Sequence, residues 1–442
     1  MTGTRSVPGD GAAGPVRRPG LGDHVVTLPS TVVREARRTC EGVGRTLSEQ
    51  PGVRALSAVP RAARFMSRLG GDGSALPVPG LSPIFAAQVV MDELALALAQ
   101  GLNRLPTPGD YERVSAELAH ARWLFEERGW LDEPASYHRT PPPLAEVSFA
   151  RGRTVQQPYE RMLFPSGWSA RPEEPGAERW TSYEGNATAA VTLLRHRDRP
   201  RPWVVAVHGF GMGFPFMDLT GLHAVHLHRD LGLNVAMPVL PLHGPRRINR
   251  LSGEAFLGFD LVNTVHGLAQ AVWDIRRLLS WIRAQDPPGV GAYGVSLGGY
   301  VVALLAALDG DLDAAVAGVP VVDFPELFGH QSPLHIRLRA VEHEILEGHA
   351  EIVHRVVSPL AMPPKVPWGR RFVFGGLGDR MALPEQALAL WHHWDEPAVS
   401  WYSGNHVGYL WSKQVRSFLD GAFGACGLQA EPLEGTPGAA AR

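Results

Sequence analysis

Gly294-Val295-Ser296-Leu297-Gly298 is the most informative stretch of this chain. It follows a short apolar run at residues 290–293, typical of a buried strand, and precedes a helix-compatible run at residues 300–308. A sharp turn between a strand and a helix lifts the serine hydroxyl clear of the sheet and leaves no room for side chains beside it. The stretch therefore makes Ser296 the candidate nucleophile, and its neighbours in the sequence decide the fold.

A second glycine-rich stretch, His208-Gly209-Phe210-Gly211-Met212-Gly213, follows the apolar strand expected at residues 203–207. Glycines at the end of a strand let backbone N–H groups point into the crevice there. An acyl-transfer site needs two such donors, and removing one typically costs about 10²–10³ in rate. We expect the amides of Phe210 and Leu297 to form this oxyanion hole, with His208 and Gly209 as substrate-binding candidates. The alternatives are a turn without a ligand and a phosphate loop, but the G-x-G-x-x-G spacing and the Lys-Ser/Thr pair of such loops are absent.

Two polar side chains follow expected strands nearer the C-terminus. Asp379 comes after an apolar strand at residues 371–375, and His406 comes after a strand at residues 398–402. An open α/β sheet places its ligands just beyond the ends of such strands. We therefore expect Ser296, Asp379 and His406, in this chain order, at one edge of the sheet.

This combination of motifs resembles the α/β-hydrolase superfamily over roughly residues 171–425. The resemblance implies a mostly parallel sheet with flanking helices and a serine hydrolase that needs no cofactor and no metal. It also implies that Ser296 is the nucleophile, that His406 acts as general base and then acid, and that Asp379 orients the imidazole. A less specific likeness, in the loop at residues 240–247, is to the dienelactone-hydrolase and acetyl-esterase-like branches of the superfamily.

The assigned residues have plainer alternatives. Asp379 could be a turn or cap residue, and Asp323 competes for the acid role because it also follows an expected strand, at residues 314–322. The sequence Asp323-Phe-Pro-Glu326 also fits a capping box with proline in the first turn, which would explain Asp323 without chemistry. His406 is one of 18 histidines, so its type alone assigns no role.

Arg246 and Arg247 are further candidates for binding a substrate. Either guanidinium could clamp an anionic group by two parallel hydrogen bonds. Alternatively, either could pair with Glu254 or Asp260 at the domain surface.

The expected domain organisation has four parts. Residues 1–24 form a disordered N-terminus, and residues 25–140 form a helical N-terminal extension or cap, with helices at 30–48, 84–102 and 111–129. Residues 141–425 form the catalytic domain, which contains a helical lid at about 324–367. Residues 426–442 form a disordered tail. The lid holds His335, His343, His349 and His354, but no carboxylate or thiolate set completes a metal site with them.

Composition limits the remaining classes of function. The formal net charge of −2 gives no concentrated cationic surface for nucleic acid, and two cysteines form neither a disulfide framework nor a redox pair. No secretory signal is recognisable at the N-terminus, so we expect a cytoplasmic protein. The most hydrophobic segment, residues 84–102, carries Asp92 and Glu93 in its middle, which disfavours a membrane span. A buried or interfacial helix is expected there, and peripheral membrane contact is the alternative.

The sequence therefore predicts a hydrolase that cleaves a small-molecule carboxylic ester through an acyl-enzyme. Acyl transfer or amide hydrolysis by the same residues is an alternative, and so is a binding protein that keeps the fold without turnover. The sequence leaves the natural substrate and the oligomeric state open.

Overall fold

The computed structural model describes residues 52–69, 75–102 and 105–429. The helix expected at residues 30–48 and the N-terminal segment 1–24 lie outside these ranges. The described part of the C-terminal segment reaches Gln429, and Leu428 is buried there, so packed structure extends past the boundary expected at residue 425.

A nine-stranded sheet forms the centre of the fold, in the order β1-β2-β3-β5-β4-β6-β7-β8-β9. Strands β1, β2, β3 and β5 pair antiparallel, and β5, β4, β6, β7, β8 and β9 pair parallel. This arrangement confirms the predicted α/β fold with a mostly parallel sheet. The strands are β1 (Ser148–Arg153), β2 (Pro158–Pro165), β3 (Thr188–Leu194), β4 (Trp203–Val207), β5 (Asn234–Pro238), β6 (Val290–Val295), β7 (Ala314–Gly318), β8 (Arg371–Gly376) and β9 (Ala398–Tyr402).

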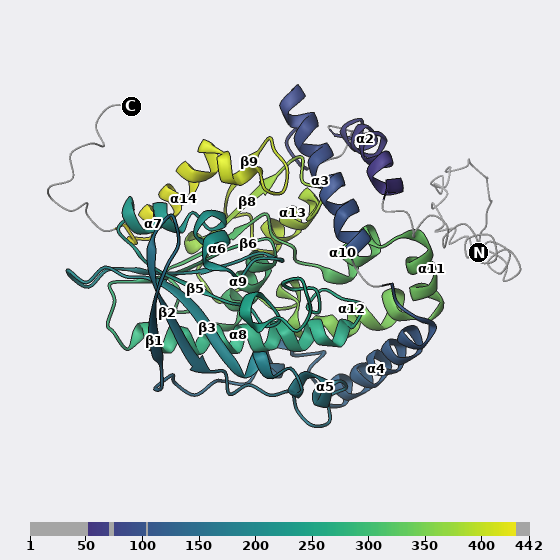
Figure 1. Ribbon diagram of the computed structural model, residues 1–442, viewed down its shortest axis with the longest axis horizontal. Helices are drawn as coiled ribbons and strands as arrows, with labels where there is room; N and C mark the ends of the chain where they lie inside the picture. Colours follow the sequence, from purple (N-terminus) through teal and green to yellow (C-terminus); the bar gives the residue numbers. More distant parts are fainter. Residues whose placement is uncertain (1–51, 70–74, 103–104, 430–442) are drawn as a thin grey trace, which may run out of the picture. The chain divides into compact units, whose positions relative to one another are not determined.

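Helices cover both faces of the sheet, because both faces are apolar. Along β4, Val205 and Val207 belong to one hydrophobic cluster, whereas Val204 and Ala206 belong to the other. The first cluster includes α8 (Leu261–Arg283) and α9 (Leu297–Leu308), and the second includes α7 (Ala224–Arg229) and α14 (Lys413–Ala425). Figure 1 shows α8 and α14 on opposite sides of the strands. Parallel strands buried on both faces read as continuous apolar runs, which is why the sequence located them.

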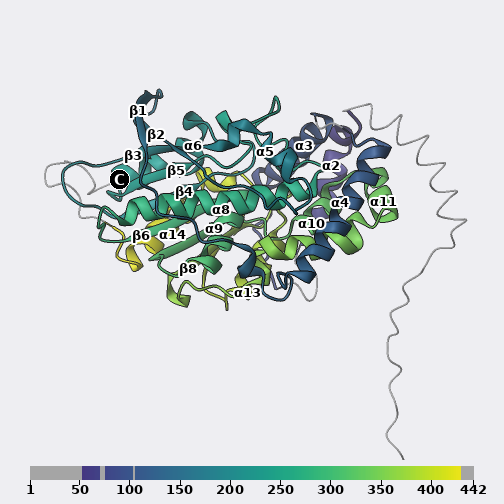
Figure 2. The ribbon, with the colours of Figure 1, turned by 90° about the horizontal axis from the view of Figure 1, so that it is seen from below.

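The helices that precede the sheet in sequence gather at one end of it. They are α2 (Gly52–Met66), α3 (Pro83–Leu102) and α4 (Pro108–Glu127). Both views place them beside α10 (Phe324–Gln331) and α11 (Leu334–Glu342) (Figures 1 and 2). Helix α2, which the sequence analysis missed, packs on α3 through Ala62, Phe85 and Val89. Within the described ranges, no helix is both long and apolar enough to cross a membrane.

The insertion between β7 and β8 is helical, as predicted. It contains α10 (Phe324–Gln331), α11 (Leu334–Glu342) and α12 (Ala350–His354). Its residues Ile345, Ala350 and Val353 are fully buried and join the cluster around α8 and α9. The hydroxyl of Ser115 on α4 donates to the carbonyl of His343 at 2.7 Å, so the insertion also packs against the N-terminal extension.

One expected strand was too long. Strand β7 ends at Gly318, whereas the sequence indicated a strand to residue 322. Val319 has a φ of 39°, a left-handed conformation that a strand cannot continue through, and its N–H donates to the carbonyl of Phe374 at 2.7 Å. The other α-helices in the described part of the chain are α5 (Ala177–Thr181), α6 (Pro215–Gly221) and α13 (Pro384–His393).

Candidate active site

Ser296 occupies the tight turn between β6 and α9. Its φ of 57° and ψ of −118° lie outside the regions that a non-glycine residue normally adopts, and such strain persists only where the surroundings enforce it. A Cβ at Gly294 would overlap the carbonyl of Gly298, and a Cβ at Gly298 would overlap the carbonyl of Val207. Both glycines are therefore required by close backbone packing, which holds Ser296 at the C-terminal end of the strand.

The glycine-rich loop after β4 lies beside this turn. A Cβ built on Gly209 would come within 3.4 Å of the Cβ of Ser296. Leu297 is the first residue of α9, so its N–H is one of the four that an α-helix leaves without an internal partner. Asp218 holds the loop in place, because its carboxylate accepts a hydrogen bond from the N–H of Gly213 at 3.0 Å. Burial raises the pKa of Asp218 to about 7.

Asp379 and His406 are in direct contact, 2.6 Å apart between Oδ2 and Nδ1. Both side chains are buried. The other oxygen of Asp379 accepts from the N–H groups of Met381 and Ala382, each at 2.8 Å, so the carboxylate is held in place. Burial by itself lowers the pKa of His406, but the charge and hydrogen bond of Asp379, with a smaller contribution from Asp92, outweigh it and raise the pKa.

The three residues reach the site from neighbouring parallel strands. Ser296 follows β6, Asp379 follows β8 and His406 follows β9, and these strands pair in parallel through β7. The carboxyl ends of parallel strands share one edge of the sheet, so all three residues emerge at that edge.

Asp323, the competing acid, caps a helix. Its Oδ1 accepts from the N–H of Glu326 at 2.8 Å at the start of α10. Only half of the expected capping box is present, because the N–H of Asp323 donates to Gln386 and the carboxylate of Glu326 accepts from the same Gln386 side chain. The capping bond accounts for the aspartate at this position.

His208, a substrate-binding candidate, is fully buried under the loop. Its Nε2 accepts from the N–H of Leu240 at 3.0 Å, which places the ring proton on Nδ1, next to the carbonyl of Gly209 at 2.8 Å. Burial lowers the pKa of His208 to about 4, so the ring is neutral. In this arrangement His208 joins the loops that end β4 and β5.

Arg246 and Arg247 have different environments. Arg246 is buried and pairs with Asp274 on α8 at 2.9 Å, so its partner is neither Glu254 nor Asp260 as the sequence suggested. Its guanidinium also donates hydrogen bonds to the carbonyls of Val239 and Asn186, so the side chain holds the loop after β5 in place. Arg247 is exposed and lies over the ring of Phe214, 5.6 Å from the ring centre.

A carboxylate that the sequence analysis did not select lies beside the Asp379–His406 pair. Asp92 of α3 accepts from the N–H of His406 at 3.0 Å. The sequence does contain a signal for it, because a buried carboxylate in an apolar helix requires partners elsewhere in the fold. The sequence analysis used that signal only as an argument against a membrane span.

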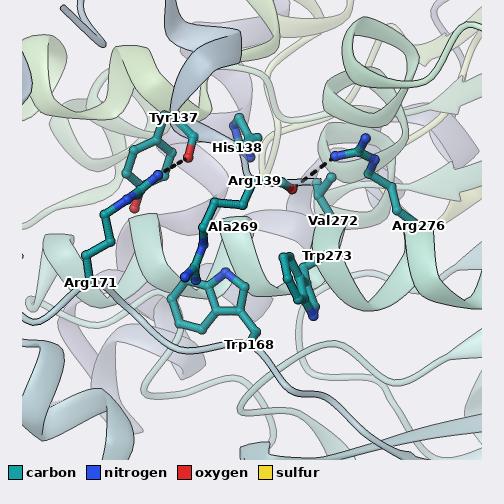
Figure 3. Close-up of a pocket in the computed structure, with 9 residues that line it drawn as sticks. All are labelled: Tyr137, His138, Arg139, Trp168, Arg171, Ala269, Val272, Trp273 and Arg276. Carbon is teal, nitrogen blue, oxygen red and sulfur yellow. Dashed lines mark hydrogen bonds between the residues drawn. The ribbon is translucent and has the colours of Figure 1, made fainter. Parts of the chain in front are cut away.

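The pocket in Figure 3 is separate from these residues. Arg139, Arg171 and Arg276 surround it together with the rings of Trp168 and Trp273. Its free volume is about 10 Å³, room for roughly one water molecule, so it is too small for a substrate. A larger hollow of about 240 Å³ lies between α9, α10 and α12. Among the described residues, no group of three or more His, Cys, Asp or Glu side chains is arranged to hold a metal ion.

Comparisons with known proteins place the chain in a family. No protein-family model matches it. An acetyl xylan esterase from Thermoanaerobacterium sp. JW/SL YS485 aligns over 69% of this chain and 94% of its own, at 13% identity and a TM-score of 0.47. An esterase from Pyrobaculum calidifontis aligns over 70% and 93%, at 15% identity and a TM-score of 0.38. Likenesses this distant say nothing about activity.

The sequence relatives are much closer. An uncharacterized protein of Mycobacterium tuberculosis (strain CDC 1551 / Oshkosh) is 42% identical over 370 residues, which is 82% of this chain and 88% of the relative. Its counterpart in strain H37Rv is 41% identical over the same shares. The sheet, the tight turn at Ser296 and this degree of identity lead to one conclusion. The chain belongs to the same family as these mycobacterial proteins, and its sheet and turn have the α/β-hydrolase fold.

Proposed function

We propose that the protein is a serine hydrolase that cleaves a carboxylic ester through an acyl-enzyme, with Ser296, His406 and Asp379 as its catalytic triad. The observation that carries the proposal is the coincidence of two features at one sheet edge. Ser296 is half-buried in a strained turn after β6, and Asp379 binds Nδ1 of His406 at 2.6 Å. Neither feature is needed for the stability of an α/β sheet.

The hydrogen bond to Asp379 fixes the tautomer of His406. With the proton on Nδ1, the other ring nitrogen is left free to accept a proton from the hydroxyl of Ser296. The serine oxygen then attacks the ester carbonyl, the alcohol leaves with the proton held by His406, and the acyl group remains on Ser296. A water molecule attacks the acyl-enzyme by the same route, releases the carboxylic acid and restores the serine.

The developing negative charge on the carbonyl oxygen needs two donors. The N–H groups of Phe210 and Leu297 are our candidates, because the loop after β4 lies beside Ser296 and Leu297 begins α9. Such donors typically contribute about 10²–10³ each to the rate. His406 must be neutral to act as the base, so activity is expected to fall as the pH drops through its raised pKa.

The same residues could serve amide hydrolysis or acyl transfer to an alcohol or amine. These reactions differ in the leaving group or in whether water is the final acceptor. A p-nitrophenyl ester series from acetyl to palmitoyl, run beside a matched p-nitroanilide and with added alcohol acceptor, separates the three outcomes.

A fluorophosphonate probe tests the nucleophile directly. The wild-type protein is expected to be labelled at Ser296, and Ser296→Ala should abolish labelling and lower kcat by up to about 10⁶, because a triad without its nucleophile loses covalent catalysis. Gly421→Ala is the matched control, since nothing lies within 4 Å of a Cβ added there on α14. Labelling of the Ser296→Ala variant at the wild-type rate, or a wild-type protein that neither labels nor hydrolyses any ester, contradicts the proposal.

A further inference from the structure

The carboxylate of Asp92 joins the two loops that carry Asp379 and His406. Its Oδ2 accepts from the N–H groups of Arg380 and His406, both at 3.0 Å, and its Oδ1 accepts from the side-chain amide of Asn405 at 2.8 Å. Arg380 directly follows Asp379 in the chain, and Asn405 directly precedes His406. One buried side chain thus fixes the backbone next to both residues.

Asp92 comes from a part of the chain that lies outside the sheet. It sits on α3, more than 280 residues away in sequence from its partners. The next residue, Glu93, is fully buried and pairs with Arg380 at 2.9 Å and with Arg61 of α2 at 2.8 Å. Phe85, also on α3, lies where a Cβ on Gly378 would meet it at 2.8 Å. Helix α3 is therefore seated directly on the loops after β8 and β9.

The charges around Asp92 form one small cluster. Burial, and then the negative charge of Asp379, raise the pKa of Asp92 to about 6, although His406 opposes the shift. In turn, burial lowers the pKa of His406, while the charges of Asp379 and then Asp92 raise it. Burial chiefly, and these two carboxylates in addition, hold the pKa of Tyr402 well above its usual range. The remaining charged groups nearby, Glu93, Arg61 and Arg380, pair with one another.

A purely structural residue at this position would not need a charge. Burying an ionised carboxylate is costly even when it is hydrogen-bonded, and a neutral amide of the same shape could accept the two backbone N–H groups. The charge is instead placed where it interacts with the imidazole of His406. Groups that orient a catalytic side chain from behind commonly act in this way.

We propose that Asp92 is a positioning residue for the hydrolase reaction, which fixes the loops of Asp379 and His406 and stabilises the imidazolium that forms during catalysis. This inference rests on the proposed function for its catalytic meaning. It makes the N-terminal helical extension a part of the active site, because α3 supplies a group that the sheet and its loops do not.

Asp92→Asn separates the charge from the hydrogen bonds. The new amide keeps an oxygen for the two backbone N–H groups, and the side chain of Asn405 can turn to meet its NH₂, since the Oδ1 of Asn405 has no hydrogen-bond partner among the described residues. The imidazolium of His406 then loses a stabilising charge. Because Asp92 is ionised only above its pKa of about 6, the effect is measured above that pH: the acid limb of kcat/KM should move to lower pH, and the ratio of kcat/KM at pH 6.5 to kcat/KM at pH 8 should rise by about threefold, with KM little changed.

Asp92→Ala removes the hydrogen bonds as well as the charge. It should lower kcat by about 10²-fold, the scale expected when a catalytic group is misplaced by about 1 Å, and Asp92→Asn should recover most of that loss at pH 8. Glu93→Gln is the matched control, because Glu93 is equally buried on the same helix but is not among the groups that act on His406. It should lower the thermal midpoint without moving the acid limb. If Asp92→Ala does not fold, the Asn variant and the Glu93 control carry the test.

A histidine NMR titration makes the test independent of turnover. The resonance of His406, assigned by its loss in His406→Gln, should titrate at lower pH in Asp92→Asn than in the wild type and in Glu93→Gln. An unchanged titration in Asp92→Asn, or an equal shift in Glu93→Gln, overturns the inference. A wild-type protein that is neither labelled by fluorophosphonate nor active on esters contradicts the proposed function instead, and the NMR result then still decides whether Asp92 acts on His406.

Discussion

The turn around Ser296 and the seat of helix α3 meet at the same edge of the sheet, but they are built in opposite ways. The turn is shaped by backbone sterics and marked by two glycines within five consecutive residues: a Cβ on Gly294 would meet Gly298, and one on Gly298 would meet Val207 at the end of β4. The seat of α3 depends on polar side chains that meet across more than 280 residues, as Asp92 does with Arg380 and His406. The turn can therefore be recognised from a short motif, whereas the contacts of α3 form only once the chain has folded.

The two constructions should also fail differently. The turn has no space for an added atom at either glycine, so a substitution there should both displace Ser296 and strain the sheet. The polar contacts of α3 can lose one charge and keep their geometry. A substitution there can therefore change the chemistry of His406 while the fold persists.

Among the polar contacts, the largest loss of activity is expected from a substitution at Asp379. Asp379→Asn should lower kcat by about 10⁴, because the amide favours the wrong tautomer of His406. Asp323→Ala should leave kcat near the wild-type value and lower the free energy of unfolding by about 0.5–2 kcal/mol, since the side chain caps α10. Steady-state kinetics on a p-nitrophenyl ester and urea unfolding measure both quantities. The reverse kinetic pattern would transfer the acid role to Asp323.

Gly298→Ala tests the close packing of the turn. The added Cβ collides with the carbonyl of Val207, so we expect the free energy of unfolding to fall by about 1–3 kcal/mol and the rate of fluorophosphonate labelling to fall by about 10²-fold. The control, Gly421→Ala, lies in α14 with open space around it and should stabilise the protein slightly. A Gly298→Ala protein with wild-type labelling and stability would show that the turn is not sterically enforced.

The smallest effect is expected in the insertion between β7 and β8, which the sequence analysis predicted to be a lid. Leu334 and Leu338 of α11 are 53% and 45% exposed, so replacing both by alanine should change stability by less than about 0.5 kcal/mol. If the segment contacts the substrate, the ratio of kcat/KM for long and short acyl esters should change by up to about tenfold.

The matched core variant for this test is Ile345→Ala. Ile345 is fully buried in the main cluster, so its loss should cost about 2–5 kcal/mol of stability instead of acting on selectivity. An unchanged chain-length profile in the Leu334/Leu338 double variant would mean that the insertion is a packing element and not a lid.

Regular, locally encoded elements were predicted closely. The expected bounds of two strands, at 203–207 and 398–402, match β4 and β9. Strand β4 is fully buried and therefore has an uninterrupted apolar pattern, and a proline directly precedes both strands. The end of β7 was predicted wrongly, because Val319 adopts a left-handed φ of 39° that its apolar side chain does not indicate.

Arginine and aspartate partners were the least predictable features. Nothing local to Arg246 indicates Asp274, because the two meet only when α8 packs beside the loop after β5. Helix α2 was not singled out because it contains Pro60 in its interior, and its packing on α3 stabilises it.

The sequence by itself determined the order of strands and helices, the glycine-bounded turn that presents Ser296, and the places of Asp379 and His406 after their strands. These follow from apolar periodicity and from sterics over a few residues, which any chain with this sequence carries before it folds. Only the tertiary structure decided that Asp379 binds His406 and that Asp92 reaches both of their loops. A hydrogen bond requires two groups about 3 Å apart, and for residues far apart in sequence that proximity is a product of the whole fold.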